Sequence, residues 1–187
     1  MYRPIAAVSL FALFALTGFT PSVGQTNQPA NDLVIILDAS GSMWGQIEGE
    51  NKIVIARRVL KDLTASLPED TNVGLVAYGH RREGDCNDIE TVIPLGSLDR
   101  DAFAATVDGI NPKGKTPITK SIEETFSTLQ SHDSPVTVIL VSDGLETCSG
   151  DPCTAVREAR ESGIELLMHV GQRSRDDPVA QLRQITA

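Results

Sequence analysis

Hydrophobic positions along this chain fall into two alternating patterns, continuous apolar runs and runs with helical spacing. The continuous runs are typical of strands buried on both faces, and they cover residues 33–37, 73–78, 136–141 and 164–170. The stretches with helical spacing predict helices over residues 53–67, 99–107, 118–129 and 152–161 and from Pro178 onward. Because strands and helices alternate, we expect an α/β fold: a doubly wound, mostly parallel sheet with helices on both faces.

One further strand interrupts this alternation. Residues 91–95 form a short apolar run that follows the strand at 73–78 after only the polar loop HRREGDCND. That loop is too short for a helical crossover, so the run predicts one antiparallel strand at the edge of the sheet. Two helix boundaries are also marked, since Asp99 is expected to cap the helix that follows it and Pro68 to stop the helix before it.

The N-terminal residues 1–24 have the features of a secretory signal peptide. Arg3 precedes an apolar run over residues 5–19, and small residues follow up to Gly24. The apolar run is short for a membrane span of roughly 20 residues, which would be the alternative, an uncleaved anchor. We expect residues 25–31 to form a polar linker and no stable membrane span to remain after cleavage. Export predicts a secreted or periplasmic protein.

Composition limits the class of protein and the kind of partner. The chain has 187 residues, of which 41 % are hydrophobic and 22 % charged. These values are typical of one globular domain with a real core, and they exclude a disordered or collagen-like chain. The formal net charge of −9 disfavours a phosphate backbone or an anionic membrane surface, so we expect no nucleic-acid partner.

Three cysteines, an odd number, require an explanation in an exported protein. Cys148 and Cys153 share the short loop CSGDPC and are expected to close a small disulfide, which would leave Cys86 free or exchanging. The alternative is a zinc site built from these cysteines and His80, although the spacing between Cys148 and Cys153 is poor for zinc ligands.

A cluster of oxygen-bearing side chains follows the first strand directly. Asp38, Ser40 and Ser42 present one carboxylate and two hydroxyls at alternate positions, and Gly41 lets the loop turn tightly. Oxygen ligands of low total charge suit a hard divalent cation such as Mg²⁺. Ligands in such sheets bind at the carboxyl ends of the strands, where this loop lies. The alternative is a serine-rich turn that caps the next helix.

Three separated motifs together resemble a known site. The sequence ILDASGS is followed by GKTP, which contains Thr116, and by VSDG, which contains Asp143. In this order they resemble the metal-ion-dependent adhesion site of von Willebrand factor type A domains. The resemblance covers residues 32–187, and the stretch LVAYGHRREGDCNDIE is similar to the secreted bacterial branch of that family.

The resemblance implies a role for each of the five residues. Ser40, Ser42 and Thr116 would coordinate the cation directly, and Asp38 and Asp143 would act mostly through water. One coordination position would remain for a Glu or Asp carboxylate of a partner protein. The implied function is a divalent-cation-dependent protein-binding module of the bacterial cell envelope, not an enzyme, with Mg²⁺ as cofactor and Mn²⁺ or Ca²⁺ as alternatives.

The resemblance also implies a shortened C-terminus. Domains of this family normally continue through another strand and helix, whereas this chain stops at Ala187. We therefore expect the C-terminal strand and helix to be missing, which would leave the strand at 164–170 as an unprotected edge. Related sequences often carry a cysteine near the position of Gln184, and its loss would account for the odd number of cysteines.

Two metal-dependent hydrolases are the alternative functions. The stretch GINPKGKT at residues 109–116 matches the phosphate-binding loop of NTPases, but a helical stretch precedes it where that loop requires a buried strand. In a phosphatase of the haloacid dehalogenase type, Asp38 would be the nucleophile. That chemistry needs a second carboxylate two residues later, where this chain has Ser40.

Overall fold

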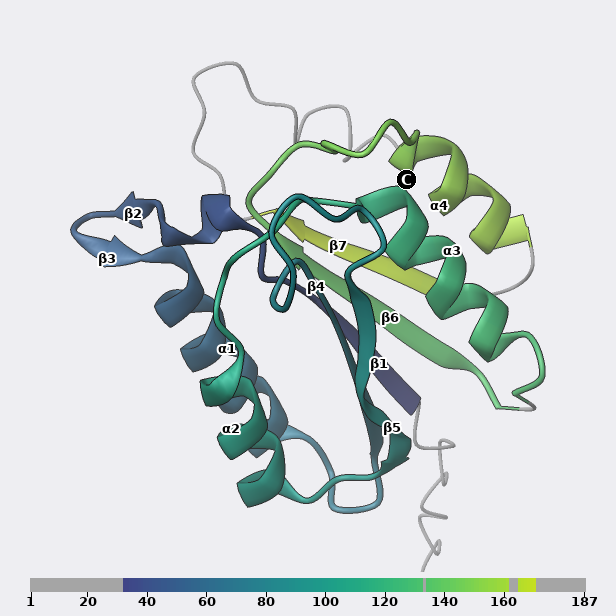
Figure 1. The fold of residues 1–187 in the computed structure, drawn as a ribbon. Helices are drawn as coiled ribbons and strands as arrows, with labels where there is room; N and C mark the ends of the chain where they lie inside the picture. Colours follow the sequence, from purple (N-terminus) through teal and green to yellow (C-terminus); the bar gives the residue numbers. More distant parts are fainter. Residues whose placement is uncertain (1–31, 133, 162–164, 171–187) are drawn as a thin grey trace, which may run out of the picture.

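The computed structural model describes residues 32–132, 134–161 and 165–170, and it contains one central sheet between two pairs of helices (Figure 1). The sheet has the strand order β5-β4-β1-β6-β7. Its strands are β1 (Asp32–Asp38), β4 (Asn72–Tyr78), β5 (Ile89–Ser97), β6 (Val136–Ser142) and β7 (Glu165–Val170). The helices are α1 (Lys52–Ser66), α2 (Arg100–Gly109), α3 (Ile118–Leu129) and α4 (Pro152–Glu161).

The pairing of the strands confirms the predicted fold class. β1 pairs in parallel with β4 and β6, β6 pairs in parallel with β7, and β5 pairs antiparallel with β4 at the edge. The predicted cap is also present, since the Asp99 carboxylate accepts a hydrogen bond from the N–H of Ala102 at 3.0 Å. The signal peptide, the linker and the helix expected from Pro178 lie outside the described residues.

Both faces of the sheet are buried, which explains the continuous apolar run of β1. Side chains of Val34 and Ile36 pack with those of α3 and α4, whereas Leu33, Ile35 and Leu37 pack with those of α1 and α2. Figure 1 shows the two helix pairs on opposite sides of the sheet. A strand covered on both sides needs apolar residues at every position and loses the alternation of a half-exposed strand.

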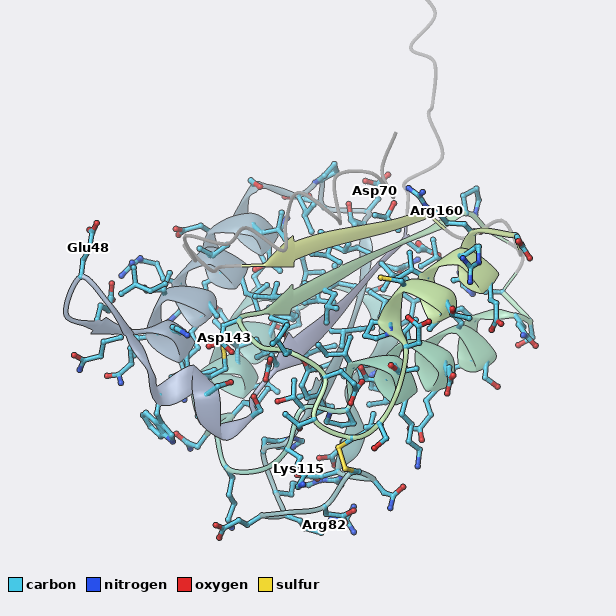
Figure 2. All side chains as sticks on the ribbon, turned by 90° about the horizontal axis from the view of Figure 1, so that it is seen from above. Glu48, Asp70, Arg82, Lys115, Asp143 and Arg160 are labelled. Carbon is cyan, nitrogen blue, oxygen red and sulfur yellow. A yellow bond between two sulfur atoms is a disulfide. The ribbon has the colours of Figure 1, made fainter. Side chains whose placement is uncertain are left out.

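The connection between β1 and α1 contains structure that the hydrophobic pattern did not predict. A short 3₁₀ helix, η1 (Gly41–Trp44), is followed by a hairpin of β2 (Gln46–Ile47) and β3 (Glu50–Asn51). Glu48 and Gly49 form its turn with φ of 53° and 88°, and Glu48 lies at the protruding tip in Figure 2. Two-residue strands are too short to show a period of two, so periodicity could not find them.

The strand register brings the functional loops together. Asp38, at the end of β1, pairs with Tyr78 at the end of β4, and the neighbouring Leu37 pairs with Val141 of β6. The loops after β1, β4 and β6 therefore leave the sheet at the same edge. Within the described ranges, no helix has the length and apolar character needed to cross a membrane.

Candidate metal-binding site

Asp38 lies at the centre of this edge and is fully buried. Its Oδ1 accepts a hydrogen bond from the N–H of Ser40 at 2.8 Å, and its Oδ2 accepts one from Ser142 Oγ at 2.7 Å. Tyr78 in turn donates from its hydroxyl to Ser142 Oγ at 3.3 Å. Both oxygens of the carboxylate are thus oriented by the ends of β1, β4 and β6.

Three side-chain oxygens form a continuous chain next to Asp38. Ser40 Oγ lies 2.9 Å from Ser42 Oγ, and Ser42 Oγ donates to Asp143 Oδ1 at 2.8 Å. Adjacent oxygens in an octahedral Mg²⁺ shell, with bonds of about 2.0–2.1 Å, are about 2.9 Å apart. The spacing and the hard, oxygen-only donor set therefore fit a small divalent cation.

Thr116 enters the site from the loop before α3. Its N–H donates to Thr147 Oγ1 at 2.8 Å, and the N–H of Thr147 donates back to the Thr116 carbonyl at 3.1 Å. A Cβ placed on Gly144 would lie 3.4 Å from Ser42 Oγ, 3.5 Å from Thr116 Cγ2 and 3.7 Å from Asp38 Oδ2. These three side chains therefore converge on one point, and the structure brings all five predicted residues together.

The loop that carries Thr116 rests directly on the backbone of the neighbouring strand ends. The N–H of Gly41 donates to the Gly114 carbonyl at 2.9 Å, and the N–H of Gly114 donates to the Gly79 carbonyl at 2.7 Å. Gly79 has φ +70°, and a Cβ there would lie 2.5 Å from the Lys115 carbonyl oxygen, so only glycine fits. Close backbone packing thus positions Thr116 beside β1.

The same loop argues against an NTPase. Residues 109–116 follow α2, which ends at Gly109, so a helix and not a strand precedes the GKT sequence. A phosphate-binding loop requires a strand before it and a helix directly after its lysine. The carbonyl of Pro112 is also engaged, since it accepts a hydrogen bond from Trp44 Nε1 at 2.9 Å.

Burial controls the electrostatics of the site. Loss of solvent raises the pKa of the Asp38 carboxyl, and the hydrogen bonds from Ser142 and Ser40 offset this only in part. Burial, with the nearby charge of Asp38 second, raises the pKa of Tyr78 well above its ordinary value, so the phenol stays neutral. Negative charge is disfavoured at this edge unless a positive charge lies close to it.

Sequence reasoning missed Lys52, Ser142 and Tyr78 as parts of the site. The VSDG motif could have indicated Ser142, because this residue immediately precedes Asp143 there. Lys52 carried no signal in the sequence, yet its Nζ donates to Asp143 Oδ2 across 91 residues. That contact depends on where α1 begins in space.

The predicted pairing of the cysteines was wrong. The structure joins Cys86 to Cys148, with their Cα atoms 5.6 Å apart, and leaves Cys153 exposed and free. Cys153 belongs to the first turn of α4, where its N–H donates to Asp151 Oδ1 at 3.0 Å. Folding brings the loop after β4 against the loop after β6, and so pairs cysteines separated by 62 residues (Figure 2).

The zinc alternative loses its ligands for the same reason. Cys86 and Cys148 are joined to each other, and a disulfide sulfur is not a thiolate ligand. His80 bonds instead through Nε2 to Glu90 Oε2 at 2.9 Å. Among the residues that the structure describes, no group of three or more His, Cys, Asp and Glu side chains could hold a metal ion.

The disulfide anchors a loop that is ordered by Asp88. This carboxylate is fully buried and accepts the N–H groups of Arg81 and Arg82 at 2.7 and 2.8 Å, and Arg81 Nε at 2.8 Å. Burial alone would raise the pKa of Asp88, but these hydrogen bonds outweigh it and lower the pKa below the ordinary carboxyl value. The bridge from Cys86 to Cys148 ties this loop to the one that holds Gly144 and Thr147.

Comparison with known proteins identifies the family. The von Willebrand factor type A domain matches residues 32–187, and the chain belongs to this family. It is 28 % identical over 177 residues to the Bacillus subtilis protein YwmD, and the aligned region covers 90 % of this chain and 79 % of YwmD. It is 32 % identical over 149 residues to YwmC of the same organism, covering 75 % of this chain and 65 % of YwmC.

Solved structures share the fold at low identity. The pilus adhesin SpaC of Lactobacillus rhamnosus GG matches with a TM-score of 0.67 and 17 % identity, over 87 % of this chain and 27 % of the adhesin. The manganese-loaded TRAP protein of Plasmodium vivax matches with a TM-score of 0.62 and 22 % identity, over 84 % of this chain and 62 % of TRAP. At these identities the likeness concerns the fold.

Proposed function

We propose that this protein is a divalent-cation-dependent protein-binding module of the cell envelope, which captures an acidic side chain of its partner. The observation that carries the proposal is the chain of oxygens from Ser40 Oγ through Ser42 Oγ to Asp143 Oδ1, with separations of 2.9 and 2.8 Å. The 2.9 Å between Ser40 Oγ and Ser42 Oγ, the two proposed ligands, matches the edge of a Mg²⁺ shell. Asp143 orients Ser42 through its hydrogen bond, and the fully buried Asp38 lies beside them.

Each residue has a defined task in this proposal. Ser40, Ser42 and Thr116 would hold Mg²⁺, or Mn²⁺ or Ca²⁺ in its place, while Asp38 and Asp143 orient the hydroxyls and balance charge. A bound cation would supply an electrophilic centre, and a partner Glu or Asp carboxylate could complete its coordination. Ser142 donates a hydrogen bond to Asp38, and Tyr78 donates one to Ser142, so that together they keep the Asp38 carboxylate in place.

The hydrogen bonds of Ser40 and Ser42 favour binding over catalysis. Their hydroxyls bond to each other and to a carboxylate, an arrangement suited to coordination. Histidine is the usual proton acceptor for a serine nucleophile, and two histidines bond to other groups: His80 Nε2 bonds to Glu90 and His132 Nε2 bonds to Asp32. We therefore propose a module that binds without turning over a substrate.

An exported location agrees with these features. The Cys86–Cys148 disulfide is the kind of bond that persists in oxidising compartments and is rare in a reducing cytosol. The fold is shared with a pilus adhesin and with a manganese-loaded protein, which supports a metal-dependent contact with another protein. We propose the periplasm or the cell exterior as the site of action.

Calorimetric titration with MgCl₂ and MnCl₂ tests the metal site directly. We expect one binding event in the wild type that is lost in Asp38→Ala and strongly weakened in Thr116→Ala. The matched controls are Asp108→Ala and Thr106→Ala, which change an exposed and a half-buried position on α2 and should bind as the wild type does. Unchanged cation binding in Asp38→Ala would contradict the assignment. Retention of an envelope partner on the immobilised domain should be abolished by EDTA.

A further inference from the structure

Lys52 places a positive charge directly on one of the two carboxylates of the site. Its Nζ donates to Asp143 Oδ2, and the two side chains are only 20 % and 3 % exposed. Asp143 Oδ1 is occupied by Ser42, so both oxygens of this carboxylate are engaged within the protein. Figure 2 shows Asp143 at the edge of the sheet where the loops meet.

The local backbone is shaped to hold Lys52 there. Lys52 is the first residue of α1, and its N–H donates to the carbonyl of Gly45 at 2.9 Å. A Cβ on Gly45 would lie 3.3 Å from Lys52 Cε and 3.4 Å from Lys52 Nζ. The absence of a side chain at Gly45 therefore leaves the space in which the lysine reaches the site.

This position is unfavourable for a lysine on helical grounds alone. The N-terminus of a helix carries partial positive charge, and a cationic side chain is disfavoured in the first turn. α1 has no acidic residue in its first turn that could compensate. The ion pair with the nearly buried Asp143 supplies the compensation, so Lys52 and the site are electrostatically coupled.

The charges of the site show what the coupling does. With both carboxylates ionised, Asp38 and Asp143 contribute two negative charges and Lys52 one positive charge. A divalent cation therefore leaves the group with one net positive charge, and a carboxylate from a partner brings it to neutrality. Without Lys52 the cation alone would balance the two aspartates, and buried charge is most favourable when it is balanced.

We propose that Lys52 couples the binding of the cation to the binding of a partner carboxylate. It weakens cation binding in the free protein, so that the cation binds tightly only when a partner carboxylate binds with it. The proposal rests on the proposed function and deepens it, because it concerns the same site. Its consequence is cooperative binding, in which the cation and an acidic side chain each raise the affinity for the other.

Titration of Mn²⁺ followed by electron paramagnetic resonance tests this, with and without sodium acetate as the carboxylate probe at constant ionic strength. We expect acetate to tighten Mn²⁺ binding in the wild type. Lys52→Met should bind Mn²⁺ at least about tenfold more tightly than the wild type without acetate, because a charge at contact distance shifts such equilibria by about 1–3 log units. The acetate effect should be lost in this variant.

Lys61→Met is the matched control, since Lys61 lies on the same helix and pairs with Asp108 at the surface. It should behave as the wild type does. Lys52→Gln provides a second uncharged variant, and the acetate effect in the wild type does not depend on the folding of either one. Equal Mn²⁺ affinity in the wild type and both Lys52 variants, or no acetate effect in the wild type, would overturn this inference alone. Failure of every protein to bind Mn²⁺ would overturn the proposed function as well.

Discussion

Removal of the Cys86–Cys148 bridge should lower the free energy of unfolding substantially. The bridge joins residues 62 positions apart, and the chain-entropy relation for a loop of that length gives about 4 kcal/mol at 25 °C. A bridge between Cys148 and Cys153 would close a far smaller loop, for which the same relation gives about 2 kcal/mol. The two pairings therefore predict different losses at different cysteines.

Urea unfolding of single and double variants separates these pairings. Cys153→Ser should leave the free energy of unfolding within about 0.5 kcal/mol of the wild type, because Cys153 is exposed and free. Adding Cys86→Ser to that variant should remove about 4 kcal/mol. Full reduction with dithiothreitol should bring the wild type and Cys153→Ser to the level of the double variant.

The opposite order of effects would contradict the pairing of Cys86 with Cys148. If Cys153→Ser lost about 2 kcal/mol and the added Cys86→Ser cost nothing further, the small loop would hold the disulfide. Peptide mapping of the unreduced protein provides an independent check, since it should yield a peptide pair that contains Cys86 and Cys148.

Three further predictions concern the site and its supporting loop. Gly144→Ala should fold normally, because its Cβ would lie 3.4 Å from Ser42 Oγ. It should weaken Mg²⁺ binding measured by calorimetry, because that methyl group faces Ser42, Thr116 and Asp38 of the proposed site. Tyr78→Phe removes the hydrogen bond to Ser142 and should cost about 1 kcal/mol in urea unfolding, whereas no loss would show that this bond is not formed. The pKa of Asp88 is lowered in the fold, so its stabilising effect is complete above the ordinary carboxyl pKa of about 3.9 and is lost as the pH falls through the folded value. When the pH is lowered from about 6 to about 3, the free energy of unfolding should therefore fall less in Asp88→Asn than in the wild type. An identical pH dependence of the two proteins would contradict this.

The helices and the main strands could be predicted because their signals are local. An apolar run such as that of β1 reflects burial on both faces, and the short HRREGDCND loop forces the antiparallel pairing of β5. The β2–β3 hairpin gave no such signal. Its strands contain two residues each, so no periodicity could develop, and its turn places the non-glycine residue Glu48 at positive φ.

The motif residues of the candidate site were also visible in the sequence. Asp38, Ser40 and Ser42 are neighbours along the chain and carry one carboxylate and two hydroxyls at alternate positions. Thr116 and Asp143 lie in two other motifs, and the strand order explains why they reach the same edge. The sequence thus determined the fold class and the oxygen-bearing residues of the candidate site, since both depend on local patterns and on where strands end.

The tertiary structure alone decided the partners that act across long separations. Lys52 reaches Asp143 across 91 residues because α1 begins beside the loop after β6. Cys86 pairs with Cys148, although Cys153 is nearer in sequence, because two loops pack together at the edge of the sheet. Proximity along the chain indicates which cysteines could meet most easily, but the packing of whole elements determines which sulfur atoms and charges do meet.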